Sequence, residues 1–178
     1  DRAEHALSDS HSRDLVASAE LALDAAGRFL GVRVKAEANF GAYLSMFAPS
    51  IPTTGLAKVM SGLYRIPAMH ILFDCAFTNT VPVDAIRGAG KPEALFLLER
   101  LIDIAAHETG RTPADLRRRN LLQPGDMPYK ASTGYTYDAA DCPALFEKAL
   151  TTADQGGFAA RRGDSEAKGN LRGLGFAR

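Results

Sequence analysis

The stretch Thr78–Glu99 reads TNTVPVDAIRGAGKPEALFLLE and joins an apolar strand to a long amphipathic helix. The strand is predicted over Ile71–Phe77, and apolar residues at helical spacing predict the helix over Glu93–Thr109. The loop between them is rich in residues that turn the chain or carry positive charge: Pro82, Arg87, Gly88, Gly90, Lys91 and Pro92. The strand, loop and helix therefore form the unit around which the other elements are arranged.

The chemistry of this loop is that of an anion site or of backbone that grips a polar cofactor. Gly88 and Gly90 allow close approach to the main chain, and Pro92 is suited to the first turn of a helix. The helix dipole places partial positive charge there, to which Arg87 and Lys91 add full charges. The alternative is a tight turn without a ligand, because G-x-G lacks the rest of a dinucleotide or phosphate-binding fingerprint.

The elements before the loop are predicted to be mainly β-structure. Asp14–Leu23 and Leu30–Asn39 alternate between apolar and polar residues, and the turn Asp24–Gly27 joins them into an antiparallel hairpin. Gly41 marks a bulge or a close backbone approach. A short helix is predicted over Thr54–Ser61, in a segment that packs rather than reacts.

The elements after the loop are predicted to be mainly helical. Thr112 is an N-cap for a helix over Pro113–Asn120, and a further helix covers Pro143–Asp154. Gly156–Asn170 continues as a helix with a solvated face, and Leu171–Ala177 begins a strand. We predict an α+β fold, a single domain over residues 1–178, in which an antiparallel hairpin and mixed sheet pack against two to four helices.

Three further expectations concern exposure. The polar segment Asp1–Arg13, with its two histidines, is predicted to be a solvated loop. Met69–Phe77 reads as a buried strand, in which Cys75 is a small buried hydrophobe. Arg117–Arg119 are predicted to form a solvated face or to pair with local carboxylates.

Composition excludes several classes of protein. The chain of 178 residues balances 21 basic against 21 acidic residues, so net charge predicts neither a nucleic-acid nor a membrane partner. Cys75 and Cys142 form no metal or disulfide pattern, which favours a reducing, cytoplasmic location. There is no apolar run of membrane-spanning length and no recognisable catalytic triad or metal cluster. Both ends suggest a piece of a longer polypeptide.

Several motifs together carry a family resemblance. They are the loop and its helix, GRTPADLRRRNLL, and KGNLRGLGFA, preceded by DRAEHALSDSHSRD, ANFGAYLS and YRIPA. In this order they resemble the molybdenum-cofactor-binding large subunit of the xanthine dehydrogenase/aldehyde oxidase family, nearest to its aerobic carbon monoxide dehydrogenase branch. The resemblance covers nearly the whole chain.

The resemblance implies a much longer parent subunit that oxidises a small carbonyl or heteroaromatic substrate. Such a subunit binds a molybdopterin dinucleotide, usually the cytosine form, and works with an FAD-binding subunit and a [2Fe–2S] subunit. The family's catalytic glutamate lies outside this chain. We therefore expect no catalytic and no metal-binding residue here, and the isolated piece to be inactive and without cofactor. Its exposed apolar surface predicts self-association into a homo-oligomer.

The resemblance assigns cofactor-binding positions only in the loop. The backbone amide at Arg87 would lie beside the molybdenum centre, with Gly88, Ala89 and Gly90 along the same wall. Where purine-hydroxylating relatives have a stacking phenylalanine, this chain has Ala89, which argues against purine specificity. Where copper-containing carbon monoxide dehydrogenases have a cysteine in AYRCSFR, this chain has Gly88, which cannot bind copper.

The loop AIRGAGK is closer to a second group of these chains, which read AYRGAGR, although it departs from them at Ile86 and Lys91. Two alternatives remain beside the family assignment. One is a free-standing α+β anion-binding or interaction module that uses the helix start at Gly88–Pro92. The other is a scaffold lobe in which the loop only connects a strand to a helix.

Overall fold

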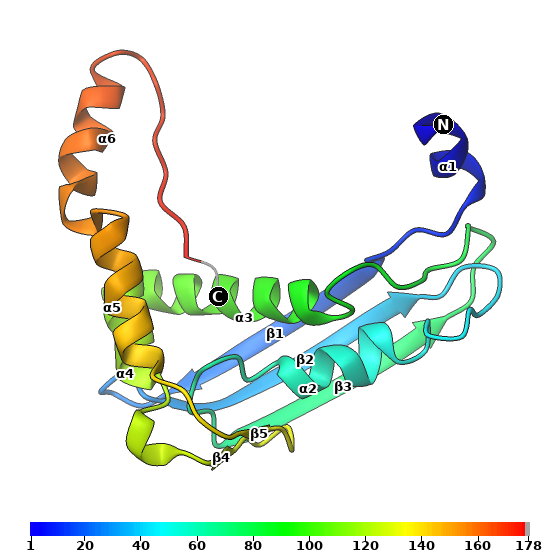
Figure 1. Ribbon diagram of the computed structural model, residues 1–178, viewed down its shortest axis with the longest axis horizontal. Helices are drawn as coiled ribbons and strands as arrows, with labels where there is room; N and C mark the ends of the chain where they lie inside the picture. Colours follow the sequence, from blue (N-terminus) through cyan, green and yellow to red (C-terminus); the bar gives the residue numbers. More distant parts are fainter. Residues whose placement is uncertain (177–178) are drawn as a thin grey trace.

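The computed structural model describes residues 1–176 and is built on a mixed sheet with helices at its ends and over one face (Figure 1). Its strands, in spatial order, are β1 (Leu15–Leu23), β2 (Phe29–Asn39) and β3 (Ala68–Ala76). β1 runs antiparallel to β2, and β3 runs parallel to β2. The predicted hairpin and the mixed sheet are thus confirmed.

Alternation along the strands separates a core face from an outer face. Val32, Val34 and Ala36 on β2 are buried, whereas the residues between them point outward. The outer face carries charge pairs between neighbouring strands, as in Lys35 with Asp74 at 3.5 Å. At the hairpin turn, Gly27 has a φ of +83° that a larger residue would rarely adopt.

Helix α3 (Lys91–Glu108) is the main cover of the core face. It is joined by a π-turn (Ile51–Gly55) that runs into α2 (Leu56–Val59), earlier than the predicted start at Thr54. The remaining helices and the small second sheet are α1 (Arg2–Ser8), α4 (Pro113–Asn120), α5 (Cys142–Thr152), α6 (Phe158–Glu166), β4 (Tyr129–Lys130) and β5 (Thr136–Tyr137). The predicted α+β class is confirmed.

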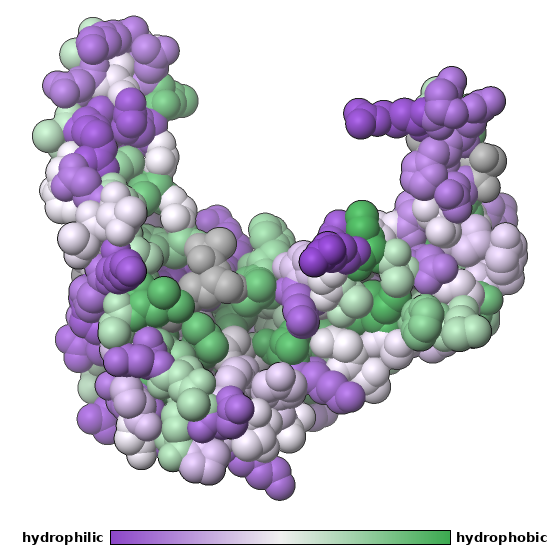
Figure 2. Space-filling view, in the orientation of Figure 1, coloured by the Kyte–Doolittle hydropathy of each residue, from purple (hydrophilic) through white to green (hydrophobic). Residues whose placement is uncertain are grey.

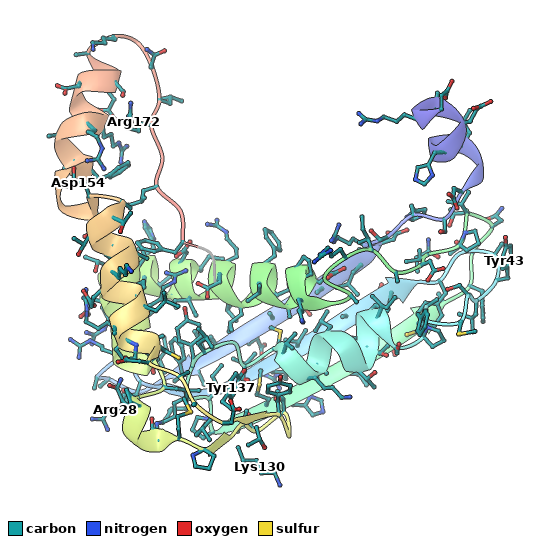
Figure 3. The ribbon with its side chains drawn as sticks, in the orientation of Figure 1. Arg28, Tyr43, Lys130, Tyr137, Asp154 and Arg172 are labelled. Carbon is teal, nitrogen blue, oxygen red and sulfur yellow. The ribbon has the colours of Figure 1, made fainter. Side chains whose placement is uncertain are left out.

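The molecule has the shape of a U. One arm is formed by α5 and α6 and the other by α1, with α3 and the sheet at the base (Figure 1). Tyr43 lies at the end of the sheet near α1, whereas Asp154 and Arg172 lie on the opposite arm (Figure 3). Hydrophilic residues cover both arms, and hydrophobic residues gather toward the base between them (Figure 2).

Two predictions for the first half of the chain are wrong. Residues 2–8 form helix α1 rather than a loop, because Asp1 and Glu4 make a reciprocal capping box at its start. β3 is an edge strand rather than a buried one, so its residues are exposed or half-buried and Cys75 is exposed. Partial burial still raises the pKa of the Cys75 thiol, with a smaller contribution from Asp74.

Two predictions for the second half are also corrected. Arg117 is fully buried, so a solvated face is wrong for it, whereas all three arginines pair with carboxylates, which was the other alternative. The predicted strand at Leu171–Ala177 is absent from residues 171–176, which run extended without a strand partner, and Ala177 lies outside the described residues.

Candidate functional site

The loop between β3 and α3 starts by folding back on the end of β2. The Thr78 amide donates to the Gly41 carbonyl at 3.0 Å, and the Ala42 amide donates to the Thr80 carbonyl at 3.0 Å. Gly41 has a φ of +73°, and a Cβ there would overlap the Val81 carbonyl oxygen. The predicted close approach at Gly41 is confirmed, and it fixes where the loop leaves the sheet.

The segment that follows α1 runs beside the same loop. The His11 amide donates to the Pro82 carbonyl at 3.1 Å, and the Asp84 amide donates to the His11 carbonyl at 2.8 Å. Two residues later, Arg13 Nη2 donates to the Arg87 carbonyl oxygen at 3.4 Å. This neighbour is about 70 residues away in the sequence, and nothing in the pattern of residues predicts it.

The tip of the loop contains the four predicted cofactor-binding residues in one turn. Gly88, Ala89 and Gly90 all have positive φ, at +107°, +39° and +90°. The Ala89 amide donates to the Ile86 carbonyl at 2.9 Å, which closes the turn. Arg87 and Ala89 are exposed, whereas Gly90 is buried. The turn is therefore accessible to a ligand at Arg87 and Ala89 and packs against the protein at Gly90.

Gly90 has two structural roles. It contacts the π-turn so closely that a Cβ would lie 2.6 Å from both the Ile51 carbonyl oxygen and the Leu56 amide nitrogen. It is also the N-cap of α3, where no side chain caps the first amides. The start of α3 therefore keeps its partial positive charge, beside the exposed Lys91.

The first turn of α3 also holds a buried carboxylate. The Glu93 side chain is 11% exposed, and its Oε1 lies 3.6 Å from Arg13 Nε. Its other oxygen, Oε2, is buried without a hydrogen-bond partner among the described residues. A buried acceptor of this kind is costly unless a donor reaches it.

A hollow of about 320 Å³ lies beside the loop tip. It is bounded by the π-turn and α2 on one side and by the loop on the other, and its lining is Phe47, Ser50, Ile51, Thr54, Gly55, Lys58, Ala85 and Ala89. The segment around the short helix predicted over Thr54–Ser61, which was expected only to pack, thus faces the predicted site. The prolines at 49 and 52 and Gly55 were the available signal, since they exclude a regular helix there.

Further along α3, a buried ion-pair cluster surrounds Arg117. Its Nε donates to Glu99 Oε2 at 2.7 Å, and its Nη1 donates to Asp103 Oδ1 at 2.7 Å. The Tyr64 hydroxyl donates to Glu99 Oε1 at 2.8 Å, and the Phe176 ring lies 4.9 Å from the guanidinium. Burial acts to lower the pKa of Arg117, but the attraction of Glu99 and the bond to Asp103 outweigh it and raise the pKa.

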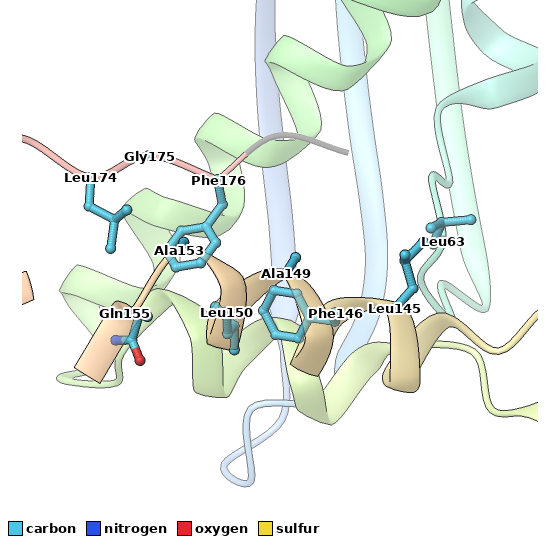
Figure 4. Close-up of a pocket in the computed structure, with 10 residues that line it drawn as sticks. All are labelled: Leu63, Leu145, Phe146, Ala149, Leu150, Ala153, Gln155, Leu174, Gly175 and Phe176. Atoms are coloured by element: carbon cyan, nitrogen blue, oxygen red, sulfur yellow. The ribbon is translucent and has the colours of Figure 1, made fainter. Parts of the chain in front are cut away.

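A strongly apolar hollow lies away from the loop, between α5 and the C-terminal segment (Figure 4). It has a volume of about 360 Å³ and is lined by Leu63, Leu145, Phe146, Ala149, Leu150, Ala153, Gln155, Leu174, Gly175 and Phe176. Gln155 is the single polar side chain in this lining. The hollow therefore offers packing surface and no group for acid–base or metal chemistry.

Across residues 1–176, no three or more His, Cys, Asp or Glu side chains are arranged to hold a metal ion. None of the helices in that range has the length and apolar character that a bilayer span requires.

Comparison with known proteins places this geometry in a family. Residues 1–121 match the molybdopterin cofactor-binding domain, a range that contains both the loop and the start of α3. The chain belongs to this family. The resemblance seen in the sequence is confirmed at this level.

The relatives are subunits of oxidoreductases. The chain is 38% identical to the 6-hydroxypseudooxynicotine dehydrogenase complex subunit gamma of Paenarthrobacter nicotinovorans, over 86% of this chain and 20% of that protein. It is 32% identical to the carbon monoxide dehydrogenase large chain of Hydrogenophaga pseudoflava, over 99% of this chain and 22% of that protein. The crystal structure of quinoline 2-oxidoreductase from Pseudomonas putida 86 superposes with a TM-score of 0.88 at 28% identity, covering 95% of this chain and 22% of that one.

The chain thus spans about a fifth of the length of these relatives. The residues at the loop fit a large polar cofactor held from one side. The tip is exposed, and no side chain caps the start of α3. The buried acceptor on Glu93, which has no partner within residues 1–176, would be satisfied only by a donor group of the ligand. Backbone amides and a helix start are the groups expected to hold a polar or anionic ligand.

Proposed function

We propose that this chain is part of the large subunit of a molybdenum-dependent oxidoreductase, in which Arg87, Gly88, Ala89 and Gly90 form one wall of the molybdopterin site. The observation that carries the proposal is the family match over residues 1–121, which includes a loop tip that is exposed at an uncapped helix start. The bound cofactor would supply the redox chemistry at molybdenum. This chain would supply backbone that holds and orients it.

The small side chains of the wall determine how much space a substrate would have. Ala89 and Ala85 line the hollow next to the loop tip together with the π-turn, so the wall leaves room for a substrate beside the cofactor. The aromatic side chain in this lining is Phe47, which is 59% exposed. We propose a small heteroaromatic or carbonyl substrate for this hollow. Relatives named for nicotine, quinoline and carbon monoxide chemistry agree with that range.

The parent would work as a multi-subunit complex. The relatives include a complex subunit and large chains, which supports partner subunits in general. We propose an FAD-binding subunit and a [2Fe–2S] subunit as these partners, the cytosine dinucleotide as the form of the cofactor, and the cytoplasm as the location. The glycine at 88 makes copper chemistry of the cysteine-ligated kind unavailable to this parent.

Metal analysis of the purified parent complex tests the proposal. We expect about one molybdenum per large subunit and a releasable cytosine nucleotide, since the proposed site holds one dinucleotide cofactor. The 178-residue chain purified alone should contain none, because it provides one wall of the site. A parent complex without molybdenum would contradict the proposal.

One observation favours a second function, anion binding by the chain itself. The 18-residue helix α3 begins without a side-chain cap and next to Lys91. If this start binds anions on its own, titration of the isotope-labelled chain with inorganic phosphate should shift the Gly88 and Gly90 amide resonances at millimolar phosphate. Unchanged resonances would remove this alternative.

A further inference from the structure

We infer that Arg13 is a positioning residue that aims the peptide between Arg87 and Gly88 toward the cofactor side of the loop. The inference rests on the proposed function for what lies on that side. The contacts themselves belong to this chain. They join the guanidinium of Arg13 to the carbonyl of Arg87 and to the mostly buried carboxylate of Glu93.

The chain holds Arg13 at this place at some conformational cost. Its φ is +65°, in the left-handed region that residues with a Cβ rarely adopt. The two backbone hydrogen bonds made by His11, to Pro82 and from Asp84, fix the preceding residues alongside the loop. A strained backbone kept in place by neighbouring hydrogen bonds is typical of a residue whose side chain must point in one direction.

The side chain of Arg13 then reaches both parts of the junction between the loop and α3. Its Nε lies 3.6 Å from Glu93 Oε1, an ion-pair distance, and its Nη2 donates to the Arg87 carbonyl oxygen at 3.4 Å. The fork of the guanidinium allows both contacts at once, which an ammonium group cannot reproduce. Because the Glu93 side chain is mostly buried, solvent screens this ion pair less than it would screen a pair on the surface.

The contact with the Arg87 carbonyl has a geometric consequence for Gly88. A trans peptide is planar, and its C=O and N–H point in opposite directions. A guanidinium that holds the Arg87 oxygen therefore directs the Gly88 N–H away from Arg13. Gly88 has a φ of +107°, so sterics restrain its own backbone little. The guanidinium adds to the hold of two backbone bonds, from the Ala89 amide to the Ile86 carbonyl and from the Lys91 amide to the Gly88 carbonyl.

Hydrogen–deuterium exchange of the complete parent complex tests this role. The variant is Arg13→Asn, because asparagine accepts positive φ and its short side chain lacks the guanidinium. We expect amides of residues 84–95 to exchange about tenfold faster, the scale for losing one hydrogen bond to a charged group, while α5 is unchanged. The matched control is Arg33→Asn, on the outer face of the sheet, where the arginine side chain is 68% exposed. It should leave the loop unchanged.

Two more variants separate positioning from general stability. Arg13→Lys keeps the charge near Glu93 but not the fork, so loop exchange should rise by about threefold with an unchanged melting temperature. In the double variant Arg13→Asn/Glu93→Gln the buried charge is gone, and much of the protection of α3 should return while the Arg87–Gly88 peptide stays mobile.

Loop exchange equal to wild type in both Arg13→Asn and Arg13→Lys would overturn the inference. So would faster exchange that is uniform over the whole subunit, which indicates lost global stability. In the loaded enzyme, Arg13→Lys should lower kcat more than it raises KM, because it misplaces the cofactor wall rather than the substrate. Molybdenum content of the wild-type complex tests the proposed function separately, and the exchange result for Arg13 stands whether or not molybdenum is found.

Discussion

Helix α3 is held at its middle and at its start by different means. At the middle, Arg117 is 0% exposed and pairs with both Glu99 and Asp103 at 2.7 Å. At the start, the ion pair between Arg13 and Glu93 spans 3.6 Å, and Arg13 is 38% exposed. The middle is thus a closed polar core, whereas the start is an open surface with positive-φ backbone.

The contrast shows how one helix can pack into the core at its middle and still contribute its start to a candidate ligand site. The buried cluster joins α3 to α4 and to Tyr64, which precedes β3, so it fixes the helix on the sheet. The start can then stay open, with exposed residues and without a side-chain cap, without loss of the fold. Sites with unsatisfied groups are stable only when the surrounding structure holds them.

The largest loss of stability is expected from breaking the buried cluster at the middle of α3. Arg117→Met leaves the Glu99 carboxylate buried without its cation, which should lower the free energy of unfolding by about 3–5 kcal/mol. The control Arg119→Met removes a cation that is 44% exposed and should cost less than about 1 kcal/mol. Urea unfolding of the chain followed by circular dichroism measures both. Equal costs for the two variants would mean that the cluster is not a stabilising core.

The next largest loss of stability is expected at the start of α3, from Gly90→Ala. The added Cβ would meet backbone atoms of the π-turn at 2.6 Å and would sit at positive φ, so we expect a loss of about 3 kcal/mol or more. Gly110→Ala is the control, because Gly110 also has positive φ, at +66°, but nothing lies within 4 Å of its Cβ position. It should cost about 1–2 kcal/mol. Similar losses in thermal unfolding would show that the contact with the π-turn is unimportant.

Tyr64→Phe, in the buried cluster at the middle of α3, should cause an intermediate loss of stability. It removes the hydroxyl that donates to Glu99 Oε1 at 2.8 Å and leaves the ring, which should cost about 1.5–3 kcal/mol. Tyr135→Phe is the control, since the Tyr135 side chain is 48% exposed. Chemical unfolding compares them, and a difference below about 0.5 kcal/mol would argue against a charge-assisted bond.

The smallest effect is expected from surface pairs of α4. The bond from Arg118 lowers the pKa of Glu147, and the bond from Arg119 lowers the pKa of Asp115, each below its ordinary value. A lowered pKa in the folded state gives stability above the ordinary pKa that disappears as the pH falls through the lowered value. Both carboxylates are well solvated, so each pair contributes less than about 1 kcal/mol.

The check is the difference in unfolding free energy between wild type and Arg118→Gln, measured from pH 7 to pH 3. It should shrink toward zero at the acid end. A difference that stays constant or grows as the pH falls would show that the pairing with Glu147 is not its source.

Much of the fold was predictable because local signals agreed with the final packing. The hairpin, the helix after the loop and the capped helix at Thr112 all follow from alternation, helical spacing and capping residues. The errors have a common physical cause. The exposure of β3 and the burial of Arg117 are decided by tertiary neighbours, such as the lack of a further strand beside β3 in the described sheet.

The site was predictable only in part. The turn at residues 87–90 follows from its glycines and from the helix that comes after it. Its neighbours do not, because Arg13 lies 74 residues before Arg87 and is joined to it by folding alone. The π-turn that faces Ala89 was also missed, since prolines exclude a regular helix without specifying what replaces it.

A cryo-electron microscopy structure of the loaded parent complex tests the central claim most directly. It should place backbone N–H groups of residues 87–90 within hydrogen-bond distance of a sulfur or oxygen of the molybdenum cofactor, about 3–3.5 Å. It should also show the Arg87 carbonyl turned toward Arg13. Cofactor density on the far side of α3, with the loop facing solvent or another subunit, would contradict the account.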